Sequence, residues 1–145
     1  MSKSWAWLIL CLSSIACAQS VLIPVSQCVV HAGDNPAWAK PDLEESGWKP
    51  YTQYDFSFNQ PRLWMRCKAD LGAIRGLSDP AIQLSFPAAY EAYFDGRLVG
   101  RFGSLRTGDY SMDQIRTWAL PPLSADAHGV IAVRFAVRDQ LILQR

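Results

Sequence analysis

The stretch Glu91-Ala-Tyr-Phe-Asp-Gly-Arg-Leu-Val-Gly-Arg101 carries the strongest fold signal in this chain. Asp95 and Gly96 stand alone between two short apolar runs. A two-residue turn of this composition predicts a β-hairpin, because both turn residues need positive φ. The expected cross-strand pairs are Phe94 with Arg97, Tyr93 with Leu98 and Ala92 with Val99. Both faces of such a hairpin carry apolar groups, which is typical of the inside of a β-sandwich or of a contact with another domain.

Short stretches with a period of two flank the hairpin and indicate further strands. Strands are expected at 27–31, 63–71, 81–86, 114–120 and 131–137, in addition to the two arms of the hairpin. Pro24 suits an edge position for the first of them, since proline cannot donate to an interior ladder. One helical turn is expected at 41–45 and a turn at His128-Gly129. Many short strands at regular spacing predict an all-β antiparallel sandwich.

The first eighteen residues have the features of a secretory signal peptide. Lys3 supplies the positive start, 5–15 are apolar, and Ala16-Cys17-Ala18 is a small-x-small cleavage site. A lipoprotein signal through Cys17 is less favoured, because Ser14 stands where a branched aliphatic residue is usual. We therefore expect a leader at 1–18 and one β-sandwich domain at 19–145, secreted or periplasmic, whose mature chain does not insert into a membrane.

Charge and cysteine content limit the partners of the mature domain. Lys3 leaves with the leader, so basic and acidic residues balance, which argues against nucleic acid or an anionic membrane as the main partner. Cys28 and Cys67 are an even pair in an oxidising compartment. They form either a disulfide, which would stabilise the fold by about 4 kcal/mol, or two buried thiols.

Several segments resemble galactose-binding-like jelly-roll domains over most of 31–138. The segments are Gly33-Asp-Asn-Pro-Ala-Trp-Ala39, Glu45-Ser-Gly-Trp48, Leu63-Trp-Met-Arg66, the hairpin at 92–100, Trp118-Ala-Leu-Pro121 and Val130-Ile-Ala-Val-Arg134. Met65, Ala69 and His128-Gly129 depart from the usual pattern at packing and turn positions. The resemblance implies a jelly-roll β-sandwich.

The resemblance also implies two functional settings. One is the extracytoplasmic sensor region of bacterial membrane signalling proteins, such as histidine kinases, PP2C-type phosphatases or nucleotide cyclases. The other is the sugar-binding accessory domain of a family 2 glycoside hydrolase. We expect a non-catalytic ligand-binding or sensor module, as a fragment of a signalling protein. The alternatives are the glycosidase accessory domain and a stand-alone carbohydrate-binding protein.

No arrangement of residues in the sequence indicates catalysis. Glu44 and Glu45 are adjacent on a surface turn, and Glu91 has no partner whose distance can be argued, so the paired carboxylates of a glycosidase are not predicted. His31 and His128 have no companions at metal-ligand spacing. We expect no enzyme activity and no cofactor. Asp34 with Asn35, or Asp109, has the oxygen groups that bind a structural calcium ion. Oxygen-only ligand sets have no diagnostic spacing, however, so the sequence does not predict one.

The candidate ligand-binding residues lie in two loops. Tyr54 lies in the aromatic-polar loop at 49–61 and Arg62 directly follows it, whereas Arg106, Asp109 and Tyr110 follow the hairpin. Aromatic rings can stack on a sugar or another small polar ligand while polar groups bind its hydroxyls. Packing against an edge strand or a neighbouring domain explains the same residues. Trp38 and Trp48 are expected to clamp the opening loop rather than to stack on a ligand.

Overall fold

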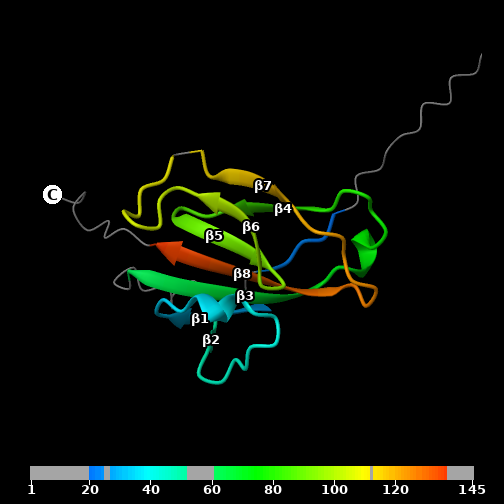
Figure 1. Ribbon diagram of the computed structural model, residues 1–145, viewed down its shortest axis with the longest axis horizontal. Coiled ribbons are helices and arrows are strands. Elements are labelled where there is room, and N and C mark those ends of the chain that lie inside the picture. The colour runs from blue at the N-terminus through cyan, green and yellow to red at the C-terminus, as the bar shows by residue number, and fades with distance from the viewer. Residues whose placement is uncertain (1–19, 25–26, 52–60, 112, 137–145) are drawn as a thin grey trace, which may run out of the picture.

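The computed structural model describes residues 20–24, 27–51, 61–111 and 113–136. The leader predicted at 1–18 therefore lies outside the described residues. None of the helices in the described part is long and apolar enough to cross a membrane. These residues form two antiparallel sheets, seen in Figure 1 as one layer with β3 and β8 and another with β4 and β7. The expected all-β antiparallel sandwich is confirmed.

The larger sheet has six strands in the order β2-β1-β3-β8-β5-β6, and the smaller sheet pairs β4 with β7. The strands are Cys28–Ala32 (β1), Lys49–Pro50 (β2), Arg62–Asp70 (β3), Ala81–Ser85 (β4), Ala89–Phe94 (β5), Arg97–Phe102 (β6), Ile115–Ala119 (β7) and His128–Ala136 (β8). Two short 3₁₀ helices, Pro36–Ala39 (η2) and Gly72–Ile74 (η3), lie in the connections. Strands β3 and β8 are the longest and form the centre of the large sheet.

The hairpin between β5 and β6 forms as predicted, with one difference in register. Asp95 (φ 47°) and Gly96 (φ 80°) make the turn, and the two strand pairs nearest to it are the expected ones. The third expected pair is wrong. Ala92 lies opposite Gly100 instead of Val99, because a β-bulge adds one residue to β6.

The bulge matches like side chains across the hairpin. Beyond it, Tyr90 lies opposite Phe102 and Glu91 lies opposite Arg101. An unbroken register would have set Tyr90 opposite Arg101, and so a charge against an apolar ring, because directly opposed residues share a face. The bulge therefore keeps the apolar face of β6 continuous with the core.

Three local expectations are wrong. Strand β1 is not an edge strand, because Lys49–Pro50 pairs along its outer side. The helical turn expected at 41–45 lies instead at Pro36–Ala39, where the Asn35 side chain accepts a 3.0 Å hydrogen bond from the next free backbone N–H. The turn expected at His128-Gly129 lies at 124–127, where the Ala127 N–H donates to the Ser124 carbonyl at 3.0 Å, and His128 already begins β8.

The inner face of the large sheet forms the apolar core. Tyr90, Val133 and Phe135 are fully buried there. Cys28 and Cys67 are direct cross-strand partners between β1 and β3, and the structure joins them in a disulfide. Of the two states that the sequence leaves open, the structure has the bonded one.

The outer face of the same sheet is covered by the opening loop, which we define as residues 33–48. Trp64 and Arg66 project to this face from β3, and both are almost completely buried. The sequence predicted a half-buried strand here, and that prediction is wrong over Leu63–Cys67. The alternation is present, but the opening loop covers the side on which the polar residues lie.

Candidate functional site

The structure places the predicted ligand residues at one end of the sandwich but does not gather them. Tyr54 lies outside the described residues. Arg62 begins β3, whereas Arg106, Asp109 and Tyr110 follow β6. Strands β8 and β5 stand between β3 and β6, so three strand spacings, about 14 Å, separate the two groups.

These residues also have contacts of their own. Arg62 lies 3.6 Å from the Asp34 carboxylate. The Tyr110 ring packs on Phe102 at 6.2 Å and belongs to the core cluster. The carbonyl of Asp109 accepts a 2.8 Å hydrogen bond within its own loop. Their role in binding a ligand therefore stays a prediction that packing alone also explains.

An ion-paired network crosses the outer face at the edge of the opening loop. The Arg134 guanidinium donates to both oxygens of Asp34, at 2.6 and 2.9 Å, and to Glu91 at 3.0 Å. Glu91 also accepts from Tyr93 at 2.7 Å and from Arg101 at 2.9 Å. Five side chains from four segments thus hold the loop, β5, β6 and β8 together.

The network fixes the protonation state of its two acids. The hydrogen bond from Arg134 holds the pKa of Asp34 below its usual range. Burial alone would raise the pKa of Glu91, but the hydrogen bonds from Tyr93, Arg101 and Arg134 outweigh it and lower the pKa. Burial, followed by the Glu91 contact, raises the pKa of Tyr93 to about 12. A glycosidase acid needs a raised pKa, so neither carboxyl suits that role.

The tryptophans of the opening loop pack as a clamp. Trp38 makes edge contacts with Trp48 at 5.5 Å and with Trp64 at 6.4 Å. His31 fits beside both loop indoles, at 4.6 and 5.4 Å. These rings contact one another over the sheet, and Trp38 and Trp48 are partly buried by that packing.

The oxygen groups considered for calcium are engaged by the protein. Both oxygens of Asp34 accept from Arg134, and the Asn35 side chain caps η2. No group of three or more His, Cys, Asp or Glu residues suitable for a metal occurs within the described residues. Asp34 and Asn35 therefore do not fit a calcium site, because a cation there would have to displace a guanidinium.

A polar cleft opens at the end of the sandwich that carries the Asp95-Gly96 turn. It encloses about 690 Å³, within the range of roughly 300–1,000 Å³ found for small-molecule sites. Its floor is the end of the outer face. The residues lining it are Pro41, Lys68, Ala69, Asp70, Asp95, Ser124, Asp126, His128, Gly129 and Val130.

Local hydrogen bonds fix the acids of this cleft. One oxygen of Asp70 accepts from the Gly72 N–H at 2.9 Å, and one of Asp95 accepts from the Val130 N–H at 2.8 Å. The Ser124 hydroxyl donates to one oxygen of Asp126 at 2.5 Å. The Asp126 carboxyl also interacts with the backbone N–H groups of His128 and of Asp126 itself. Three hydrogen-bonded carboxyl groups thus border one cavity.

Sequence reasoning missed this cleft for a definite reason. The period of two already sets Lys68 and Asp70 on the polar side of β3. Their neighbours, however, come from register, because Asp70 lies opposite His128 and Lys68 lies opposite Val130 across β3 and β8. Residues sixty positions apart are paired only once strand order is known, and no local pattern gives strand order.

Comparisons with known proteins bear on the fold. No family model matches the chain, and no curated protein matches it. Two matching solved structures are of β-glucuronidase 2 from Bacteroides uniformis. One is a calcium-binding mutant, at a TM-score of 0.61 and 17% identity over 81% of this chain and 15% of that chain. The other is covalently bound to cyclophellitol-6-carboxylate aziridine, at a TM-score of 0.64 and 17% identity over 88% and 16%.

The jelly-roll fold is confirmed. At 17% identity the likeness shows the fold alone, and this chain spans about one sixth of the length of those structures. The neighbours are enzymes, but the part matched is the size of one accessory domain. Nothing in these comparisons points to a signalling protein.

Proposed function

We propose that this protein is a non-catalytic accessory module of a carbohydrate-active protein and that it recognises a neutral sugar in the polar cleft. The single observation that carries the proposal is the fold likeness to one sixth of a β-glucuronidase. A domain of this size in a glycosidase accompanies the catalytic part and does not contain it. The sensor-module hypothesis has no such neighbour, so the accessory module is the better supported of the two.

The chemistry of the cleft suits hydroxyl groups. The carboxyl groups of Asp70, Asp95 and Asp126 are acceptors for sugar hydroxyls, and the Lys68 ammonium, which also pairs with Glu45 at 3.1 Å, is a donor. Three acids against one lysine make the cleft acidic, so an uncharged sugar is favoured over a uronic acid. Much of the exposed lining is apolar (Pro41, Ala69 and Val130 among others), but it includes no aromatic ring to stack on a sugar. We therefore expect millimolar affinity.

The proposal is tested by nuclear magnetic resonance titration with neutral monosaccharides and short oligosaccharides, with glucuronate alongside. Neutral sugars should shift the backbone signals of His128 to Val130, and Asp126→Asn should weaken binding about tenfold by removing one charged acceptor. Asp113→Asn is the matched control, because Asp113 lies outside the cleft and pairs with Arg116. Signals that stay fixed at millimolar concentrations of every sugar would reject carbohydrate recognition in this cleft.

Export is a separate part of the proposal. The leader at 1–18 should be removed after Ala18, so that the exported protein begins at Gln19. N-terminal sequencing of protein recovered from the periplasm or medium tests this directly. Recovery of the unprocessed chain in the cytoplasm would contradict it.

A further inference from the structure

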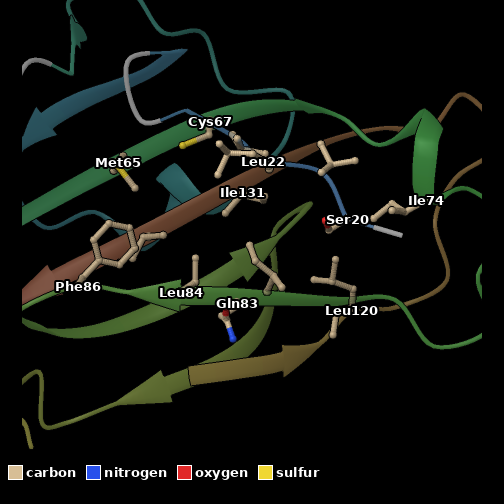
Figure 2. A pocket seen from close by; sticks show the side chains of 15 residues that line it. Ser20, Leu22, Met65, Cys67, Ile74, Gln83, Leu84, Phe86, Leu120 and Ile131 are labelled. Atoms are coloured by element: carbon tan, nitrogen blue, oxygen red, sulfur yellow. The ribbon is translucent and has the colours of Figure 1, made fainter. Parts of the chain in front are cut away.

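An apolar cavity of about 400 Å³ lies between the two sheets. Figure 2 shows Met65 and Ile131 projecting from β3 and β8 toward Leu84 of β4, while the Gln83 amide points away from the space. The lining contains no Asp, Glu, Lys, Arg or His. The cavity exists because, within the described residues, the second sheet has only two strands over a six-stranded partner.

The N-terminal segment closes one side of this cavity. We call residues 20–23 the strap. Val21 and Ile23 pack against the core, and Leu22 between them is 88% exposed. In the described part of the chain no backbone hydrogen bond joins the strap to either sheet. Two aliphatic side chains therefore hold it in place, and such a segment opens locally at small cost in free energy.

We infer that this cavity is a binding site for a linear alkyl chain with an uncharged head group, and that the strap competes with the ligand. A pocket lined mainly by apolar side chains favours apolar molecules, and its volume lies in the range of small-molecule sites. The strap is itself an extended chain that inserts aliphatic side chains into the pocket. A flexible linear alkyl chain therefore fits in the place that the strap occupies. A charged head group would find no counter-ion in the lining, which disfavours it.

The test uses the full chain and the fluorescence of the uncharged dye N-phenylnaphthylamine, displaced by hexanol, octanol and decanol. Each added methylene should tighten binding about fourfold until the cavity is full. Decanoate should bind more weakly than decanol, because its carboxylate is unpaired. Absence of dye binding, or displacement that does not depend on chain length, would overturn the inference.

Matched variants separate a site from adsorption on the surface. Val21→Ser should tighten decanol binding severalfold by weakening the strap, whereas Ile115→Ser should leave it unchanged because Ile115 is an exposed aliphatic residue outside the cavity. Leu84→Trp should abolish binding by filling the cavity, with Ile82→Phe as a second filling variant if the first does not fold. If Val21→Ser lowers the melting temperature but leaves decanol affinity unchanged, the strap only stabilises the fold and does not compete with a ligand, and the inference fails. The sugar titration concerns a different cavity, so either result leaves the proposed function standing.

Discussion

The two faces of the six-stranded sheet are both buried, but by different means. On the outer face the opening loop brings charged and aromatic side chains that pair with one another, and the buried Arg66 is held by three acceptors. On the inner face a two-stranded sheet brings mainly apolar groups, together with Arg116 stacked 4.6 Å over the Phe102 ring, and leaves a cavity. The outer face is closed mainly by specific contacts and the inner face mainly by apolar area, and free space remains in different places: a cleft at the end of the outer face and a cavity between the two sheets.

The difference indicates where each face can bind. A hydrogen-bonded network has few alternative arrangements, so the outer face offers a ligand only its end, where the polar cleft lies. The cavity on the inner face is lined by no charged side chain, so it can exchange one aliphatic group for another. The proposed sugar and the proposed alkyl chain therefore belong to opposite faces.

The largest effect is expected from the inner face. Replacing both Cys28 and Cys67 by Ser should lower the free energy of unfolding by about 4 kcal/mol, because the disulfide closes a loop of 39 residues in the unfolded chain. Urea denaturation with and without reductant measures it. Equal stability of the oxidised and reduced wild-type protein would show that the bond contributes nothing.

The next effect tests the outer face. Arg66→Met should cost about 3 kcal/mol, because it leaves the carbonyls of Trp38 and Pro41 without their donor. The lower end of the usual range applies, since Glu45 keeps its 3.1 Å contact with Lys68. Lys68→Met, exposed on the same face, is the control. A loss below about 1 kcal/mol in Arg66→Met would mean that indole packing alone holds the opening loop.

A smaller effect is expected at the hairpin turn, which both faces share. Asp95→Ala should cost about 2 kcal/mol, because alanine tolerates a φ of 47° poorly and cannot accept from the Val130 N–H. Asp95→Asn keeps both properties and should stay close to wild type. Asp95→Pro, which cannot adopt positive φ, should be worse than alanine. Melting temperatures in the order Asn, Ala, Pro would confirm the turn, and any other order would contradict it.

The sequence predicted what depends on neighbours in the chain. The turn at Asp95-Gly96, the alternation in β3 and β8 and the jelly-roll motifs are local patterns, and each led to a correct element. The bulge in β6 was missed because it is decided by matching Phe102 with Tyr90 across the hairpin. A period of two predicts which residues of a strand share a face, but it does not predict which strand lies beside that strand in the sheet.

The site depends on the part that the sequence could not give. Alternation places Arg66 and Glu91 on the polar side of their strands, where exposure is expected. The opening loop covers that side, and both residues are buried. The polar cleft likewise needs the pairing of β3 with β8. Of the ligand residues predicted from loop composition, Arg62 and Tyr110 turned out to be held by the protein itself, because aromatic and charged loop residues serve packing as readily as binding.

The smallest effect concerns acid, and it distinguishes the faces most cleanly. Asp34 and Glu91 have pKa values lowered from 3.8 and 4.5 by their partners in the outer-face network. Their contribution is therefore fully present above about pH 5 and is lost as the pH falls through the lowered folded-state values. It should amount to about 1 kcal/mol, because both acids are partly solvated. Glu91→Gln should flatten the fall in urea midpoint between about pH 5 and pH 2, whereas Asp113→Asn, in an exposed pair, should not. The inner cavity is lined by no Asp or Glu. If the fall in urea midpoint at low pH were as large in Glu91→Gln as in the wild type, the acid-sensitive contact would lie outside this network.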